Sequence, residues 1–349
     1  MKKKIYSLAL ASAMMLSLCA CGGTSDSTQK GASSDKDTYK VGIIQYVDDA
    51  SLNQIEENIE KELDAKGKEL GVTFDYADYT YNGQADATTL NQIVAELIDS
   101  EVDIIIPIAT PTAQIVQSAT EDNQIPVVFS AVSDPVGAKL VESMDAPGAN
   151  ITGTSDALNT DTIMELILAA NPDTDYVGLL YSKSEDASTQ AIADAKEFLD
   201  DKNIKYIEKT GTTVDEVSSA ADALVAEGVD AVFTPTDNTI MTAELAIYEK
   251  FTEAKIPHFA GADSFALNGA FVGYGVDYAN LGVETADMAA DILTGKAEPA
   301  TTAVKTFDNG LATINTETCE ALGLDFDKIK EAFAEYCTEV KEIVTSKEF

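Results

Sequence analysis

Polar loops with similar residues follow apolar runs at corresponding places in the two halves of the chain. Residues 106–112 (IPIATPT) end one apolar run, and residues 232–239 (VFTPTDNT) end another with the same Thr-Pro-Thr order. A second pair of loops, 130–134 (SAVSD) and 261–264 (GADS), follows the next apolar run in each half. Ligands of open α/β sheets bind beyond the carboxyl ends of the strands, so we expect these loops to face one another across one cleft. They predict a binding site.

Side chains suited to catalysis are few. The single histidine, His258, follows Pro257 in a predicted strand, and we interpret it as an ordinary strand residue. Asp134, Asp237 and Asp263 could pair as acid and base. No nucleophile elbow, metal-ligand motif or glycine-rich phosphate loop accompanies them in the sequence. We therefore predict a binding protein that is not an enzyme and that needs no cofactor or metal.

Strand-like and helical patterns alternate along the chain and would position these loops. Apolar or alternating runs typical of strands occupy 41–47, 72–79, 103–109, 126–132, 176–181, 205–208, 230–234, 257–260 and 270–276. Helical spacing occupies 52–70, 85–98, a segment from Pro111, 160–170, 187–201, 214–227, 239–254, 279–293 and 327–344. The alternation starts again after residues 150–155, so we predict an α/β fold with two doubly wound parallel-sheet lobes.

The N-terminal segment predicts export and a lipid anchor. Three lysines precede an apolar stretch at residues 5–18. This stretch is too short for a membrane-spanning helix, which needs about 20 residues. Leu18 and Ala20 before Cys21 resemble the lipobox of bacterial lipoproteins, in which Cys21 would be acylated, for example with palmitate. We expect a signal peptide at 1–20 and a flexible polar tether at 21–38. An ordinary cleaved signal with incidental cysteines is the alternative.

The charge composition narrows the class of partner. The formal net charge is −37, from 60 acidic and 23 basic residues, and such a surface repels nucleic acid. All basic residues are lysines, so the two-pronged grip of an arginine on a carboxylate or phosphate is unavailable. An anionic ligand group must be held by lysine, hydroxyls or backbone N–H groups. Cys319 and Cys337 form either a disulfide or two buried thiols, each predicted on a helical segment.

Six stretches in register carry a resemblance to a known family. They are 41–45 (VGIIQ), 109–112 (ATPT), 130–135 (SAVSDP), 151–156 (ITGTSD), 234–239 (TPTDNT) and 261–264 (GADS) with 273–282. Together they resemble the substrate-binding lipoproteins of ABC importers, in the branch associated with tryptophan, phenylalanine and tyrosine. One departure is Ala187, where the family often shows Asn before Ser188.

The resemblance implies a type I periplasmic-binding fold, in which three crossing segments form a hinge and two lobes close on a central cleft. It implies one lobe at 39–152 with 279–306 and a second at 153–278 with 307–349. It also implies an ABC permease and an ATPase as partners, a location on the extracytoplasmic side of the membrane, and a small ligand, an aromatic amino acid. A sugar or nucleoside ligand, or a sensor that presents its ligand to a membrane receptor, would suit the same cleft. The sequence leaves these alternatives open.

A zwitterionic amino acid needs donors for its carboxylate. Thr110 and Thr112 begin a predicted helix with a proline between them, and Ser130 and Ser133 end the next predicted strand. We expect these hydroxyls to donate to the carboxylate, with simple helix capping as the alternative for Thr110.

The ammonium and the ring of such a ligand need other partners. Asp237 is the first candidate for the ammonium, followed by Asp134 or Asp263, because an unpaired buried charge is very costly. Asn238 offers both a donor and an acceptor. For the ring, Tyr46, Phe129, Phe265 and Tyr274 are candidates; we favour Tyr46 and Phe265, which lie near strand ends, and expect Phe129 to pack inside its strand. Gln45, a polar residue in an apolar strand, is expected to face the cleft or to be a satisfied core amide.

Overall fold

The computed structural model describes residues 36–307 and 310–346. The predicted signal peptide, the predicted lipidation site Cys21 and most of the predicted tether lie outside the described residues. Within the described ranges, every helix is too short or too polar to cross a membrane.

The first sheet is entirely parallel and contains six strands of the described chain. They are β1 (Thr38–Gln45), β2 (Thr73–Asp75), β3 (Thr80–Asn82), β4 (Ile104–Ile108), β5 (Val127–Phe129) and β6 (Ile151–Gly153), in the order β2-β1-β4-β5-β6 with β3 beside β1. Its helices are α1 (Ala50–Leu70), α2 (Ala87–Asp99) and α3 (Thr110–Thr120). Every residue of β4 is buried, as expected for a strand that helices cover on both faces.

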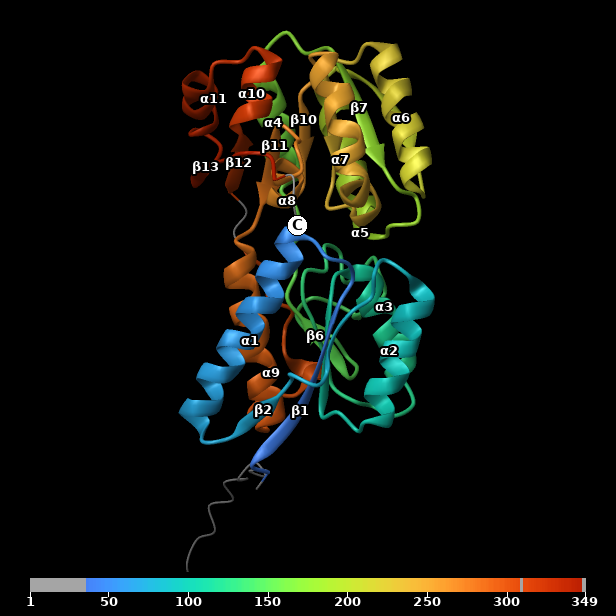
Figure 1. Ribbon diagram of the computed structural model, residues 1–349, viewed down its shortest axis with the longest axis vertical. Coiled ribbons are helices and arrows are strands. Elements are labelled where there is room, and N and C mark those ends of the chain that lie inside the picture. Colours follow the sequence, from blue (N-terminus) through green and yellow to red (C-terminus); the bar gives the residue numbers. More distant parts are fainter. Residues whose placement is uncertain (1–35, 308–309, 347–349) are drawn as a thin grey trace, which may run out of the picture. The chain divides into compact units, whose positions relative to one another are not determined.

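The second sheet has the order β13-β12-β11-β10-β9-β7-β8 (Figure 1). Its strands are β7 (Tyr176–Tyr181), β8 (Lys205–Thr210), β9 (Ala231–Thr234), β10 (His258–Ala260), β11 (Val272–Gly275), β12 (Leu311–Asn315) and β13 (Glu339–Ile343). Its helices are α4 (Thr160–Ala170), α5 (Ala187–Lys202), α6 (Val214–Glu227), α7 (Asn238–Glu253), α8 (Asp263–Leu267), α10 (Thr316–Leu322) and α11 (Phe326–Phe333). Only the pair β11–β12 is antiparallel among its described pairs.

Helix α9 (Tyr278–Leu293) comes after β11 in sequence but packs along α1 (Figure 1). The two helices can approach closely because Gly282 has no side chain. A Cβ atom at this position would lie only 2.5 Å from the carbonyl oxygen of Ile55. Lys66 of α1 also pairs with Asp287 of α9 at 2.9 Å. The chain therefore leaves the first sheet after β6, returns with α9 and η1 (Pro299–Thr301), and leaves again for β12. The exact lobe boundaries given above stay a prediction.

Two predicted elements are wrong. Of the strand predicted at 72–79, only β2 forms, because a turn closed by the Tyr79 N–H and the Tyr76 C=O follows it, and β3 pairs with β1 only after this turn. The helix predicted at 327–344 ends at Phe333, and β13 follows as a strand parallel to β12. Strand pairing with β12, which the local pattern does not reveal, overrides the helical spacing here.

Both C-terminal cysteines are free thiols. Cys319 lies in α10 as predicted, whereas Cys337 lies in the turn after α11 rather than in a helix. Burial raises the pKa of the Cys337 thiol to about 11, so it stays protonated at neutral pH.

Candidate functional site

The predicted loops meet around one cavity at the carboxyl ends of strands from both sheets. It is narrow, with a cavity volume of about 30 Å³, so its walls stand close together. The lining residues are Asp49, Ser51, Leu52, Ala109, Thr110, Ala131, Ser133, Asp156, Ala187, Thr236, Asp237, Asn238, Met241, Ala262, Ser264, Phe265 and Tyr278. We call this space the central cavity.

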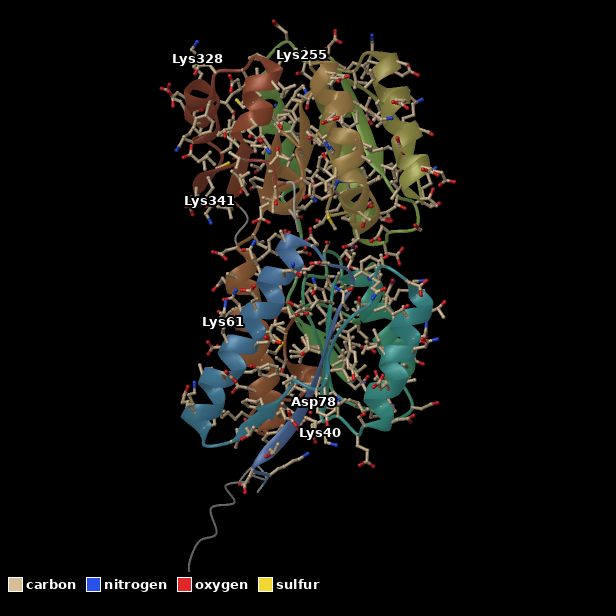
Figure 2. All side chains as sticks on the ribbon, in the orientation of Figure 1. Lys40, Lys61, Asp78, Lys255, Lys328 and Lys341 are labelled. Atoms are coloured by element: carbon tan, nitrogen blue, oxygen red, sulfur yellow. The ribbon has the colours of Figure 1, made fainter. Side chains whose placement is uncertain are left out.

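Among the described residues, no basic side chain lines the central cavity. Figure 2 shows labelled lysines such as Lys61, Lys255 and Lys328 projecting outward from their ribbons. The anionic group of a ligand in this cavity would therefore be held by hydroxyls and backbone N–H groups, as the absence of arginine predicts.

Of the ten predicted ligand-binding residues, Thr110, Asp237, Asn238 and Phe265 line the central cavity. Asp237 caps α7 by accepting a hydrogen bond from the N–H of Ile240 (3.0 Å). Its other oxygen accepts from the N–H of Ser182 and from the hydroxyl of Ser188, each at 2.7 Å. Both carboxylate oxygens of Asp237 are thus already engaged, and burial raises its pKa.

Asn238 contacts a second buried acid. Its amide nitrogen lies 3.2 Å from Oε2 of Glu185, which is 4% exposed. Burial and the nearby charge of Asp237 hold the pKa of Glu185 well above its usual range. Asn238 therefore links the wall of the central cavity to this pair of buried acids.

Gln45 and Tyr46 lie outside the lining. The amide nitrogen of Gln45 donates to Asn53 Oδ1 (2.6 Å) and to Val47 C=O (2.7 Å), so it is a satisfied amide beside the start of α1. Tyr46 is partly buried, and burial together with the charges of Glu185 and Asp237 raises its pKa to about 12.

Ser130 and Thr112 are buried beneath the cavity rather than in its wall. The hydroxyl of Ser130 lies 2.9 Å from that of Thr285, which in turn lies 2.8 Å from that of Thr154. These contacts tie the ends of β5 and β6 to α9. Thr112 Oγ1 is buried without a hydrogen-bond partner.

The remaining two predicted acids make contacts within the protein. Asp134 accepts from the N–H of Gly137 at 2.8 Å and lines a neighbouring pocket rather than the central cavity. Asp263 accepts from the hydroxyl of Ser51 (2.6 Å) and from the amide of Gln54 (3.3 Å). It therefore joins the start of α8 to the start of α1.

In the described part of the chain, three buried polar atoms in the wall of the central cavity have no hydrogen-bond partner. They are Oδ2 of Asp49 and the hydroxyl oxygens of Thr110 and Thr236. Buried polar atoms in native proteins are almost always paired, so unpaired atoms around one cavity point to a bound ligand that completes them. An ionised carboxylate only accepts hydrogen bonds, whereas the hydroxyls can also donate.

The sequence analysis missed two cavity acids, Asp49 and Asp156. Asp49 is 2% exposed and caps α1 through the N–H groups of Ser51 (3.0 Å) and Leu52 (3.1 Å). Asp156 is 3% exposed and accepts from the hydroxyl of Ser133 at 2.9 Å. Burial raises the pKa of each to about 6. Asp49 directly before a predicted helix was a recognisable capping signal, but nothing marked its second oxygen as unpaired.

The start of α3 has N–H groups that no described side chain caps, and Pro111 stands in its first turn. Ala109 before it has a φ of 78°, and Ala131 in the facing loop has a φ of 54°. Such strained non-glycine residues persist where the surrounding structure holds them, often at ligand sites.

Hydrogen bonds cross from one lobe to the other on two sides of the central cavity. On one side Ser51 of α1 binds Asp263, and the N–H of Ser264 lies 3.3 Å from the same serine hydroxyl. On the other side the amide of Gln114 in α3 lies 2.7 Å from Oδ2 of Asp186, just before α5. These contacts and the narrow cavity describe a nearly closed cleft.

Comparisons with known proteins agree with this description. The family model described as ABC transporter substrate binding protein matches residues 40–341. A curated tyrosine-binding protein of Clostridioides difficile (strain R20291) is 33% identical over 94% of this chain and 95% of its own length. The structure of an ABC domain in complex with L-Trp from Streptococcus pneumonia is 30% identical, with a TM-score of 0.78 over 87% of this chain and 99% of that one.

A ligand-free, open structure gives a lower score at the same identity. It is a substrate binding protein with adhesive properties from Clostridium difficile, 30% identical, with a TM-score of 0.66 over 88% of this chain and 100% of that one. The present structure thus resembles the L-Trp complex more than the open form, in agreement with the hydrogen bonds that cross its cavity.

Proposed function

Because the chain belongs to the family of ABC transporter substrate-binding proteins, which bind solutes and are not enzymes, we propose that it captures an aromatic L-amino acid and delivers it to an ABC importer. Its two α/β lobes have the type I periplasmic-binding-protein fold. The observation that carries the proposal is the set of unpaired atoms around the central cavity: one carboxylate oxygen and two hydroxyls.

These atoms match the two charges of a zwitterion. Asp49 Oδ2 can accept from an ammonium, and Asp156 adds a second buried carboxylate. Thr110 and Thr236 can donate to a carboxylate, which the uncapped start of α3 also favours. Asp237 and Asn238 remain candidates in the same wall, but the oxygens of Asp237 are already paired within the protein.

Side chains suited to a ring line the central cavity and come from helices of both sheets. Phe265, Met241 and Leu52 line it together with Tyr278. The tyrosine and L-Trp named for the two similar proteins are aromatic amino acids, which supports this ligand class. Closure of the two lobes around the ligand would present the complex to a membrane permease and its ATPase.

We also propose that the protein works on the extracytoplasmic side, attached by an acyl group on Cys21. ABC transporter substrate-binding proteins are extracytoplasmic, and the lipobox-like sequence before Cys21 supports the anchor. The expected result is that cells incorporate labelled palmitate into the wild-type protein and not into Cys21→Ala. Release of that variant into the medium or periplasm is expected as well. Membrane attachment of Cys21→Ala would contradict the anchor.

A thermal-shift series tests the ligand class. L-tyrosine, L-tryptophan or L-phenylalanine at about 100 times its dissociation constant is expected to stabilise the protein by about 2.7 kcal/mol. The chain contains no tryptophan, so the fluorescence of added L-tryptophan reports its binding directly. Stabilisation by sugars or nucleosides and by none of these amino acids would overturn the proposed ligand.

Variants of the cavity wall, with a matched control, test which hydroxyls contact the ligand. Thr110→Val and Thr236→Val remove unpaired hydroxyls in the cavity wall, so each is expected to weaken binding by about 1 kcal/mol or more, about fivefold. Thr112→Val removes an equally buried, unpaired hydroxyl that does not line the cavity, and it is expected to leave affinity unchanged. Equal losses in all three variants would point to an altered α3 instead of lost ligand contacts.

A further inference from the structure

A second pocket adjoins the central cavity and has more room. We call it the side pocket; its cavity volume is about 370 Å³. Ser133 and Ala187 line both spaces. Ala187 is the first residue of α5 and is 5% exposed, so one wall between the two spaces consists of a methyl group. A ligand too long for the central cavity could extend past these two small side chains.

The side pocket has apolar side chains in its wall, and its charged groups are acidic. Pro135, Val136, Met144 and Leu158 supply apolar surface. Asp134 and Asp194 supply carboxylates, while the described lining contains no basic residue. This lining favours a neutral or cationic group over an anionic one.

Two contacts indicate which end of the ligand would face the side pocket. Gln114, one turn after Thr110 in α3, contacts Asp186, the residue before Ala187. Thr110, a proposed carboxylate donor, therefore lies near the opening to the side pocket. Ser51, two residues after Asp49, contacts Asp263 beside the lining residue Phe265. Asp49 and Phe265, the proposed ammonium and ring partners, thus lie near this second contact, whereas Asp156 lies beside Ser133 at the opening.

We propose that the side pocket is an extension subsite, which accepts a neutral or cationic second residue joined to the carboxyl end of an aromatic amino acid. This inference rests on the proposed function and widens its substrate class to short peptides with an aromatic first residue. In such a ligand a peptide carbonyl replaces the carboxylate and accepts from the hydroxyls of Thr110 and Thr236.

Calorimetry with three probes on the purified protein tests the subsite. We expect L-tyrosyl-L-alaninamide to bind no more than tenfold more weakly than L-tyrosine. L-tyrosyl-L-alanine, which differs only by its terminal carboxylate, is expected to bind at least fivefold more weakly than the amide. Binding of L-tyrosine with no detectable binding of the amide would overturn the subsite and leave the proposed function intact. Absence of binding by all three probes, by L-tryptophan and by L-phenylalanine would overturn both.

Filling the side pocket separates the subsite from the central cavity. Ala191 of α5 lines only the side pocket, so Ala191→Leu is expected to weaken the amide at least tenfold and L-tyrosine less than twofold. Ala193→Leu, at an exposed position of the same helix, is the matched control and should change neither value. Val136→Trp fills the pocket from its exposed rim, where Val136 is 43% exposed, and so avoids overpacking. Equal weakening of both probes by Ala191→Leu and Val136→Trp would contradict the proposal.

Discussion

Replacing Asp49 by Asn is expected to weaken the binding of L-tyrosine by about 2 kcal/mol or more, about 30-fold, because the variant loses the carboxylate that faces the ammonium. The same change is expected to raise the free energy of unfolding of the unliganded protein at pH 7.5 by up to about 3 kcal/mol. Calorimetry measures the first effect and denaturant unfolding the second.

The pH dependence of this stability gain follows from the burial of Asp49. Burial raises its pKa from 3.8 to about 6 in the folded protein. Between these values the folded state binds more protons than the unfolded state, so this group's contribution to stability declines as the pH rises through the window. The advantage of Asp49→Asn is therefore full above pH 6 and shrinks toward zero as the pH falls to about 4. Wild-type affinity should decline as the pH falls through about 6, because protonated Asp49 no longer attracts an ammonium.

A matched control is available at Asp86. Asp86 caps α2 through the N–H of Thr89 (2.7 Å), as Asp49 caps α1, but it does not line the cavity. Asn is as good an N-cap as Asp, so both variants keep their helix starts. Asp86→Asn is expected to leave the affinity for L-tyrosine unchanged. Wild-type affinity in Asp49→Asn would move the ammonium partner to Asp156 or Asp237.

Much of the fold could be predicted from local patterns. The apolar run at β4 is a strong signal because this strand is buried on both faces. The spacing of apolar residues at α1, α4 and α6 is equally clear because each helix buries one stripe of side chains. Strand β13 was missed since its pattern is weak and its pairing partner β12 was not among the predicted strands either. The place of α9 beside α1 depends on the tertiary contact at Gly282, which periodicity does not report.

The site was predictable in outline and less so in detail. The repeated loops after the strands predicted one cavity, and the loops do meet there, because parallel strands end at one edge of each sheet. It was harder to predict which aspartate is available to bind a ligand. Asp237 and Asp49 both cap helices, yet the oxygens of Asp237 are satisfied by Ser182, Ser188 and Ile240, whereas one oxygen of Asp49 has no partner. Only three-dimensional contacts distinguish a structural carboxylate from an available one.

The single histidine belongs to a buried polar cluster next to the site. His258 Nδ1 lies 3.0 Å from Glu244 Oε1, and its Nε2 lies 2.8 Å from the hydroxyl of Thr234. His258 is 2% exposed and Glu244 is fully buried. The imidazole also meets the ring of Phe265 edge-on, with centroids 6.3 Å apart. The sequence prediction of an ordinary strand residue gives its place in β10 but not this pairing.

Replacing Glu244 by Ala is therefore expected to lower the free energy of unfolding by about 3–5 kcal/mol, as measured by urea denaturation. The variant leaves the imidazole without its partner at Nδ1 and opens a cavity beneath α7. Glu244→Gln retains a side-chain oxygen and most of the side-chain volume, so its free energy of unfolding should fall clearly less than that of Glu244→Ala.

Glu249 provides the matched control for this prediction, because it lies in the same helix and is exposed. Glu249→Ala should change stability by no more than about 0.5 kcal/mol. A loss below about 1 kcal/mol in Glu244→Ala would show that water or a rearranged imidazole replaces the carboxylate at little cost. A large loss restored by Glu244→Gln would instead assign the stabilisation to hydrogen bonding of His258, which holds Phe265 and the Thr234 loop against the central cavity.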